Sequence, residues 1–580
     1  MKDFITNEEN KLQELLSKLG FHDDNVMLLP SSKREFGDYQ YNGSMKIAKK
    51  LGKNPREIAE QISQELKDNT DYKLIEVAGP GFINITFSTD PLVNYLNEVL
   101  KTPSILLGEK INKKVLIDYG GANVAKVLHV GHLRAANIGE AIKRLATAVG
   151  MDVIGDVHLG DWGLQMGLVI YEIRERYPDL IYFKEDYDGT TIEPLPLTNE
   201  DLENMYPVAN AKAKENSEIM EEAHKITALL QEGYAPYYNV WKGITKISIS
   251  YIKEMYDKFN ANFELWNGEE ASFSYVPAML DMLKEKGLAV YDAGALIMDV
   301  SEEDDQTEIP PLLLLKSDGA SLYGTTDLAT LVDRMTNYKL DDVWYVVDKR
   351  QGLHFKQVFR AAYKSEIVPK TVNLEHMGFG TMNGKDGRPF KTRDGGTMSL
   401  ANLLDIVKEE TRKHMTDLVP KEELEETIEI IAVATIKYSD LLTNISTDYI
   451  FDIEKFCDMN GKTAPYLLYS TIRMKSLLNK AETSNYEYKQ INSESEKEIV
   501  LNLLELPSII KKSLNTKSLH EITDYLYRLT NSYNNFYSST RILTEENEDL
   551  KQSWIALTKI VYETNIKLLD ILGIKVPNKM

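Results

Sequence analysis

Cysteine is almost absent from this 580-residue sequence, in which Cys457 is the single example. One cysteine excludes an internal disulfide and any zinc site built from several thiolates, so its expected role is to fill a small space in a core. The sequence also lacks an apolar run of the ~20 residues that a membrane-spanning helix needs. Its first residues, MKDFITNEENKLQELL, lack the apolar centre of a secretory signal. We therefore expect a cytoplasmic protein with no membrane partner.

Positively charged residues are in deficit, because 67 Lys and Arg stand against 89 Asp and Glu and the net charge is -22. Binding to phosphate requires local positive charge, so this balance argues against general adhesion to nucleic acid. The deficit is not uniform, since residues 451–580 contain 17 residues of each sign. A surface for RNA is therefore easier to place at the C-terminal end.

Changes in sequence pattern predict a multi-domain α/β protein. Residues 1–105 combine helical patterns with the strand-like LIEVAGPGFINITFS and predict a small α+β domain. Residues 106–400 contain the β-rich runs VLIDYG, DVIGDVHLG, LLLLK and VWYVVD between helical stretches, as in a wound parallel sheet. An insertion is expected around 178–270, and its first part, 178–208, is rich in Pro, Asp, Glu and Gly. Residues 401–580 are predicted to be all-helical.

Two histidines, His129 and His132, lie where the first strand of this sheet is predicted to turn into a helix. Open parallel sheets bind ligands at this edge, and the start of a helix attracts phosphate through its free N–H groups. Gly131 leaves room for a flat group, and two imidazoles could donate hydrogen bonds to phosphate oxygens as charge develops on them. The alternatives are two capping or core histidines, or a zinc pair, for which the sequence offers no obvious third ligand.

The HVGH segment at residues 129–132 resembles the first signature of class I aminoacyl-tRNA synthetases. DYGGANVAKVLHVGHLRAANIGE, GDVHLGDWGLQMG, LYGTTDLAT, KRQGLH and GKDGRPFKTRDGGT resemble segments of arginyl-tRNA synthetases in particular. The two ends of the chain resemble that family's N-terminal tRNA-contacting domain and helical anticodon-binding domain. The resemblance implies a Rossmann-type class I catalytic domain between two RNA-binding domains. The implied activity is an arginine–tRNA ligase, which uses ATP to attach L-arginine to the 3′-terminal ribose of tRNA(Arg).

The resemblance also implies a pocket in which Asp118 and Asp327 hold the guanidinium of arginine, with the ring of Tyr323 beside it. A planar cation suits carboxylates, which can accept two of its hydrogen bonds side by side. Tyr323 and Asp327 lie four residues apart around a predicted strand-to-helix turn, where Thr325 or Thr326 could cap the helix. A strand aromatic and an acid in the first turn of a helix are the alternative interpretation of this pair.

The other end of the substrate is expected to meet uncharged polar groups. By the same resemblance, Asn123, His129 and Gln351 would hold the α-carboxylate and α-amino groups of arginine. His129, Gly131 and His132 would bind ATP, and Mg²⁺ would neutralise its phosphates without a dedicated protein metal site.

The second class I signature, a lysine-rich K-M-S-K loop, is missing. In its place stands NGKDGRPFKTRDGG, where Lys385, Arg388 and Lys391 could bind ATP and neutralise the departing pyrophosphate. The resemblance implies that Lys126, just upstream of the histidines, compensates for the missing lysine. Together with the two histidines of HVGH, Lys126 and Lys391 are therefore the expected catalytic residues. A solvated basic hairpin is the alternative interpretation of the loop.

Two clusters are predicted to contact tRNA. Tyr466, Tyr469 and Arg473 recur at helical spacing and could stack on the bases of an anticodon loop, although a tyrosine stripe is more often core packing. Tyr39 and Asn42 belong to the polar turn SSKREFGDYQYNG, which the family places against the tRNA elbow. An ordinary surface turn fits that segment equally well.

The chain departs from the family pattern at two places. Leu468 stands where the family commonly has Gln, which puts a polar contact from that position in doubt. GGAN replaces the usual Ser–Ala/Ser–Pro–Asn, and Gly120 and Gly121 are expected to loosen the segment that aims Asp118 and Asn123. A divergent paralogue that binds RNA or arginine without charging tRNA is therefore an alternative. A class I synthetase for another amino acid and a small-molecule nucleotidylyltransferase are further ones, and a monomer is the expected state.

Overall fold

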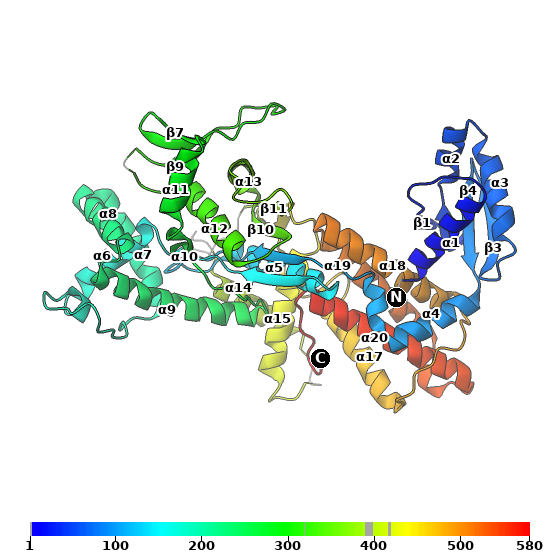
Figure 1. Cartoon of the computed structure of the whole chain (residues 1–580). Coiled ribbons are helices and arrows are strands. Elements are labelled where there is room, and N and C mark those ends of the chain that lie inside the picture. Colours follow the sequence, from blue (N-terminus) through cyan, green and yellow to red (C-terminus); the bar gives the residue numbers. More distant parts are fainter. Residues whose placement is uncertain (1–2, 318, 389–397, 416–418) are drawn as a thin grey trace.

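The computed structural model describes residues 3–317, 319–388, 398–415 and 419–580. The molecule is elongated (Figure 1), with the N-terminal unit at one end and helices α6 to α9 at the other. A parallel sheet and its helix α5 lie between these two ends. No helix in the described part of the chain is long and apolar enough to cross a bilayer.

The N-terminal unit is built on a four-stranded antiparallel sheet of order β1-β2-β4-β3. The predicted segment LIEVAGPGFINITFS forms β3 and β4, and Gly79 and Gly81 provide the positive φ angles of the turn between them. Ile58 and Ile62, one helical turn apart on α3, are fully buried under this sheet. The elements are α1 (Phe4–Lys18), β1 (Leu28–Pro30), η1 (Arg34–Phe36), β2 (Tyr39–Tyr41), α2 (Ser44–Leu51), α3 (Pro55–Leu66), β3 (Tyr72–Ala78) and β4 (Phe82–Phe87). The helices α4 (Thr89–Lys101) and η2 (Pro103–Leu107) connect this unit to the rest of the chain.

The central sheet is parallel and has the order β11-β10-β5-β6, so the predicted wound sheet is confirmed. Strand β5 has β6 on one side and β10 on the other, which makes the carboxyl edge between β5 and β10 a topological switch point. Helix α5 joins β5 to β6, and its apolar stripe of Ile138, Ile142 and Leu145 is fully buried. The elements are β5 (Lys114–Asp118), α5 (Val130–Ala148), β6 (Asp152–Asp156), β10 (Asp342–Asp348), η4 (Lys349–Gln351), α13 (Gly352–Lys364) and β11 (Asn373–Phe379).

A long segment between β6 and β10 folds into helices and a second, smaller sheet. Its helices are α6 (Leu164–Arg176), η3 (Ile181–Phe183), α7 (Asn199–Glu215), α8 (Ser217–Gln231), α9 (Ala235–Lys258), α10 (Glu269–Phe273), α11 (Val276–Glu285) and α12 (Tyr323–Asn337). The LLLLK run was expected in the parallel sheet, and this is wrong. It forms β9 (Leu312–Leu315), which pairs antiparallel with β8 (Ala295–Met298), itself paired with β7 (Ala289–Asp292). Leu313 is exposed while Leu312 and Leu314 are buried, which is the alternation of a strand covered on one face.

The C-terminal part is helical, as predicted, apart from a short strand pair. The helix α20 (Glu548–Ile571) buries Leu557, Val561 and Leu568 completely on one face. The other elements are β12 (Met382–Asn383), α14 (Leu400–Lys413), α15 (Leu424–Asp440), β13 (Tyr449–Ile450), α16 (Ile453–Phe456), α17 (Ala464–Ala481), α18 (Glu494–Thr516), α19 (His520–Ser539) and η5 (Ile542–Thr544).

Helix α5 is tied to this helical part by a buried ion pair. Arg134 is 1% exposed and donates from Nε to Asp440 on α15 at 2.7 Å, and Asp440 is fully buried. The same guanidinium donates to the carbonyl of Gly380 at 2.6 Å and lies over the ring of Tyr449. Because the pair has no access to water, it fixes the axis of α5 and therefore the direction in which the first turn of α5 points.

Candidate active site

The HVGH segment forms the first turn of α5 at the carboxyl edge of the parallel sheet. His129 is the N-cap residue, and its Nδ1 accepts the backbone N–H of Gly131 at 3.1 Å. The backbone N–H of His129 donates to Nδ1 of His132 at 3.2 Å, and the two rings stack with centroids 3.9 Å apart. The capping interpretation is therefore part of this geometry. Because both Nδ1 atoms accept hydrogen bonds, each neutral ring carries its proton on Nε2.

Both imidazoles are held in the neutral form. Burial, followed by the neighbouring His129 and Lys126, lowers the pKa of His132 to about 3. Burial and the charge of Lys126 also lower the pKa of His129. Two neutral rings with a proton on Nε2 can donate hydrogen bonds to anionic oxygens without gaining or losing a proton. This suits the stabilisation of a phosphate rather than acid–base transfer.

Lys126 supplies a cation next to the histidine pair. Its ammonium lies 4.9 Å from the centre of the Tyr206 ring. Burial lowers the pKa of Lys126, and the negative charge of Glu269 opposes that shift. A half-buried cation close to the first turn of α5 is placed where a phosphate would be expected.

Backbone contacts bring the start of α14 and the residue before it to the histidines. The N–H of Leu400 donates to the carbonyl of Leu128 at 2.8 Å, and Ser399 forms an antiparallel bridge with His129. No pattern in the sequence indicates this pairing, which joins segments about 270 residues apart. Ser399 and Leu400, which follow the basic loop in the sequence, therefore lie directly beside HVGH.

The described part of the basic loop contains two of its predicted ATP ligands. Lys385 forms ion pairs with Asp452 at 3.2 Å and with Glu454, and its side chain is exposed. The backbone carbonyl of Arg388 accepts a hydrogen bond from the backbone N–H of Gly384, which closes a tight turn. Lys391 lies outside the described residues.

The predicted guanidinium ligand Asp118 already binds a guanidinium of the protein itself. Nη2 of Arg334 donates to Oδ2 of Asp118 at 2.5 Å and to Oδ2 of Asp156 at 2.7 Å. The two aspartates are register partners on β5 and β6, and Arg334 also lies over the ring of Tyr345. Burial raises the pKa of Asp118, and the charge of Arg334 opposes this shift. A contact between Asp118 and a substrate cation would have to use its remaining oxygen, and it stays a prediction.

Asp327 and Tyr323 share the first turns of α12. The helix begins at Tyr323 and its N-cap residue is Leu322, so neither threonine is the N-cap itself. Thr325 nevertheless takes part in the capping, because its Oγ1 accepts the backbone N–H of Leu322 at 3.4 Å. Tyr323 is 75% exposed, whereas Asp327 is partly buried and lies 2.5 Å from Nε2 of His354 on α13. Sequence reasoning did not single out His354, because a lone histidine in an amphipathic helix carries no separate signal.

The remaining predicted arginine ligands come from two loops. Asn123 forms a parallel bridge with Gly160, directly after β6. Gln351 is exposed at the N-terminus of α13, next to the carboxyl end of β10. Asp118 ends β5, Asn123 follows β5 and Gln351 follows β10, so all three lie at the carboxyl edge of the sheet.

The GGAN segment is packed more tightly than its two glycines suggest. Gly120 has a φ of 76°, and a Cβ atom there would lie 2.8 Å from the ring of Phe263. The hydroxyl of Tyr256 donates to the carbonyl of Gly120. The expectation that this segment is loose is therefore wrong at Gly120, where the glycine permits a close contact.

Glu269 is a site residue that sequence reasoning missed. Its backbone N–H donates to the carbonyl of Leu159 at 3.1 Å, which places it at the carboxyl edge next to β6. Burial raises the pKa of Glu269, His158 opposes the shift, and the carboxylate of Asp327 adds to it. Because such an effect falls off with distance, Glu269 lies near Asp327. In the sequence, Glu269 is indistinguishable from an ordinary acid in the first turn of a helix.

Family models match the chain along most of its length. The model described as tRNA synthetases class I (R), catalytic domain, matches residues 96–453. The arginyl tRNA synthetase N terminal domain matches residues 7–87, and the DALR anticodon binding domain matches residues 467–580. An arginine–tRNA ligase of Agathobacter rectalis is 42% identical, with 100% of both chains covered. The chain belongs to the arginyl-tRNA synthetase family.

Solved structures of this family have the same fold. The arginyl-tRNA synthetase of Plasmodium falciparum aligns with a TM-score of 0.81 at 25% identity, covering 100% of both chains. The arginyl-tRNA synthetase of Thermus thermophilus aligns with a TM-score of 0.79 at 21% identity, again over 100% of both chains. The fold class predicted from the sequence is thereby confirmed, as is the family.

The family's N-terminal domain contains the first predicted tRNA cluster, which the structure places against α18. Tyr39 is 1% exposed and packs on Phe87, so a tRNA contact from its ring would require this packing to open. Asn42 is partly buried. In the same turn, Arg34 forms an ion pair with Glu498 of α18 at 2.8 Å. The contacts predicted for Tyr39 and Asn42 stay predictions.

The second predicted tRNA cluster lies on α17, in the region matched by the anticodon-binding model. Tyr469 is 43% exposed, while Tyr466 and Arg473 bond to Asn534 of α19. The tyrosine stripe is thus divided between packing and surface. A cavity of about 170 Å³ lies beside Tyr469, lined also by Pro465, Cys457, Met459 and the C-terminal Met580. Cys457, the single cysteine of the chain, is buried, as expected for a residue that fills a small space in a core.

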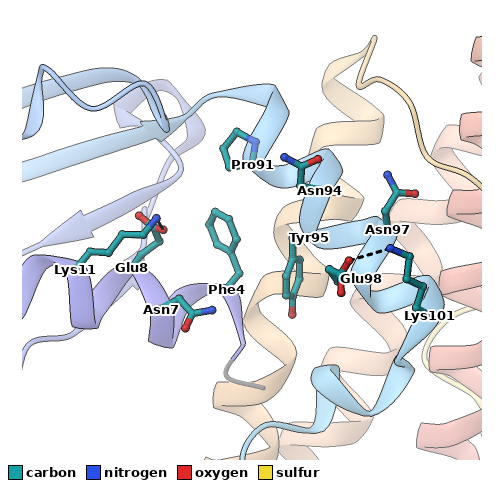
Figure 2. Close-up of a pocket in the computed structure, with 10 residues that line it drawn as sticks. All are labelled: Phe4, Asn7, Glu8, Lys11, Pro91, Asn94, Tyr95, Asn97, Glu98 and Lys101. Atoms are coloured by element: carbon teal, nitrogen blue, oxygen red, sulfur yellow. Dashed lines mark hydrogen bonds and ion pairs between the residues drawn. The ribbon is translucent and has the colours of Figure 1, made fainter.

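A cavity of about 590 Å³ lies between α1 and α4 (Figure 2), apart from the residues predicted for the site. Its charged groups are already paired, since Glu8 accepts from Lys11 at 2.7 Å and Glu98 from Lys101 at 3.0 Å. The cavity is formed by the N-terminal unit and its connector, so it adds nothing to the arginine or ATP site.

Proposed function

We propose that the chain is an arginine–tRNA ligase, which activates L-arginine with ATP and transfers it to the 3′-terminal ribose of tRNA(Arg). The observation that carries the proposal is the stacked, neutral pair His129 and His132 at the switch point of a parallel sheet, beside the acids Asp327 and Glu269. An anion-binding edge next to two carboxylates fits a reaction between a nucleotide and a cationic amino acid.

In the first step, a carboxylate oxygen of arginine attacks the α-phosphorus of ATP in line with the leaving group. The new O–P bond gives arginyl-adenylate, and the bond to the β-phosphate oxygen breaks to release pyrophosphate. His129 and His132 would donate from Nε2 to phosphate oxygens as their charge grows. Lys126, Lys385, Arg388 and Lys391 are proposed to neutralise the departing pyrophosphate.

Mg²⁺ is proposed to travel with ATP. The described residues contain no group of three or more His, Cys, Asp or Glu side chains that could hold a metal ion. When bound, Mg²⁺ would be held mainly by the phosphates of ATP and would neutralise part of their charge.

Selection of arginine is proposed to rest on the paired acids. Asp327 and Glu269 would accept hydrogen bonds from the guanidinium, and Tyr323 would cover it. Asp118, held by Arg334, would complete the acidic wall with its second oxygen. Asn123, His129 and Gln351 would bind the α-carboxylate and α-amino groups without adding charge that would oppose nucleophilic attack.

In the second step, a ribose hydroxyl of tRNA attacks the arginyl carbonyl, and AMP leaves. The exposed ring of Tyr469 and the cavity beside it support anticodon binding on α17, together with Tyr466 and Arg473. We also propose a division into three domains, at residues 1–105, 106–400 and 401–580. The protein is further proposed to be a cytoplasmic monomer.

The test is pyrophosphate exchange with each of the twenty amino acids, run with and without total tRNA. Of the twenty amino acids, we expect only arginine to support exchange, and we expect the protein to charge tRNA with arginine. Exchange with another amino acid would overturn the assignment of the acids, and binding of arginine or tRNA without exchange or charging would favour a non-catalytic paralogue. His129→Ala and His132→Ala should each slow adenylate formation by about 10²-fold. The exposed His224→Ala is the matched control and should leave the rate unchanged.

A further inference from the structure

The turn just before HVGH is held by a different helix at each of three consecutive residues. The carbonyl of Val124 accepts a hydrogen bond from Nε2 of Gln165 on α6. The backbone N–H of Ala125 donates to Oγ of Ser248 on α9 at 3.1 Å. The ammonium of Lys126 lies 4.9 Å from the centre of the Tyr206 ring on α7.

The backbone of this turn needs such support. Ala125 has a φ of 57°, a left-handed conformation that a residue with a Cβ atom adopts at a cost in free energy. Val124, Ala125 and Ser248 are each no more than 1% exposed, so the hydrogen bonds that fix the turn are shielded from water. The backbone of the turn is therefore rigid, and it sets the direction in which the side chain of Lys126 leaves it.

The three helices that hold the turn, α6, α7 and α9, belong to one packed block. Helices α6, α7, α8 and α9 pack on one another and form the end of the molecule farthest from the N-terminal unit (Figure 1). Tyr206 is partly buried in the apolar cluster of this block, which limits the freedom of its ring. The ring offers Lys126 a fixed, negatively polarised face without neutralising its charge, as a carboxylate partner would.

We propose that the helical block α6–α9 positions Lys126 for its role at the ATP phosphates, and that Tyr206 is the positioning residue that contacts the ammonium. This inference rests on the proposed adenylation reaction. It gives the helical block α6–α9 a task in the chemistry. An ammonium held over an aromatic face remains charged and can turn toward departing pyrophosphate, whereas an ammonium free in solvent would lose conformational entropy on doing so.

The test is a double-mutant cycle on Tyr206 and Lys126. Tyr206→Leu removes the aromatic face and should lower kcat/KM for ATP in pyrophosphate exchange by about five-fold, with the KM for arginine unchanged. Tyr206→Phe keeps the face and should restore the rate. In a Lys126→Met background, Tyr206→Leu should cause no further loss. The matched control is Tyr171→Leu, which removes the ring over Arg174 on α6 and should leave the exchange rate unchanged.

Equal losses from Tyr206→Leu with and without Lys126 would overturn the proposal, because Tyr206 would then only support the fold. A second readout does not depend on activity. After methylation of the lysines with ¹³C-formaldehyde, the Lys126 methyl resonance should be shifted upfield by the ring in the parent and in Tyr206→Phe, and return to the usual position in Tyr206→Leu. An unshifted resonance in the parent would refute the contact, whereas a parent without exchange activity would refute only the proposed function.

Discussion

Acidification provides a sharp test of the histidine pair, because His132 should stay neutral far below the usual range of an imidazole. An imidazole of pKa 6.5 is almost fully protonated at pH 5, whereas His132, with its pKa lowered to about 3, is about 99% neutral there. A shift of this size corresponds to about 5 kcal/mol between the protonated and neutral forms. The cost comes from burial first, and from the neighbouring His129 and Lys126 next.

The same shift links pH to stability with a definite sign. Below pH 6.5 the unfolded chain binds a proton at residue 132 and the folded chain does not, so the folded state loses stability as the pH falls from 6.5 toward 3. At pH 5 the loss attributable to His132 is about 2 kcal/mol. In His132→Asn this part of the pH dependence should disappear. Hydrogen exchange of the α5 amides, measured at pH 7.5 and pH 5, reports the difference in opening free energy.

The direct assay is ¹³C NMR of the Cε1 atoms in protein labelled at its nine histidines. His132→Asn assigns the resonance, and urea-unfolded protein provides the reference in which the imidazole titrates near pH 6.5. We expect the His132 resonance to remain constant from pH 7.5 to pH 5. A midpoint above pH 5.5 would refute the reasoning, because it would mean that water solvates the ring and that an imidazolium meets the phosphates.

Three further predictions concern arginine binding, stability and tRNA binding. Asp327→Asn should raise the KM for arginine by about 10²-fold or more in pyrophosphate exchange and leave the KM for ATP within a few-fold, since it removes the negative charge proposed to face the guanidinium; equal changes in both constants would contradict this role. Arg134→Met should lower the melting temperature, through a loss of about 3–5 kcal/mol, because it leaves the fully buried Asp440 without its partner. Asp440→Asn in the same chain should restore part of that loss, and a further decrease would contradict the pairing. Tyr469→Ala should weaken tRNA binding in a filter assay by about ten-fold, through the loss of one stacked base; unchanged affinity would remove α17 from the tRNA surface.

The positions of the first turn of α5 and of the central strands β5 and β10 followed from the sequence. KVLIDYG and VWYVVD are continuous apolar runs, and they form neighbouring strands buried on both faces. The LLLLK run has the same apolar composition, yet it forms an antiparallel strand with an exposed Leu313. Composition shows that a segment prefers to be extended, but it does not show which strand it will pair with.

The polar partners of the candidate site could not be predicted. Asp118 and Arg334 are 216 residues apart in the sequence, and neither position carries a pattern that points to the other. Likewise, Tyr39 lies in a polar segment that looks like a surface turn, but the docking of that turn on α18 buries its ring. Local patterns state which residues favour burial on their own element, whereas a polar residue becomes buried only when a distant element covers it.

The sequence by itself determined the family, the HVGH turn at the start of a helix and the presence of a single cysteine, because these depend on residue types and on short spacings. The tertiary structure alone decided that His132 is desolvated and neutral, that Arg334 holds Asp118, that Glu269 lies near Asp327, and that three helices of the block α6–α9 fix the turn carrying Lys126. Each of these depends on how far the chain excludes water from a group and which charge lies beside it, and both quantities exist only once segments hundreds of residues apart have packed together.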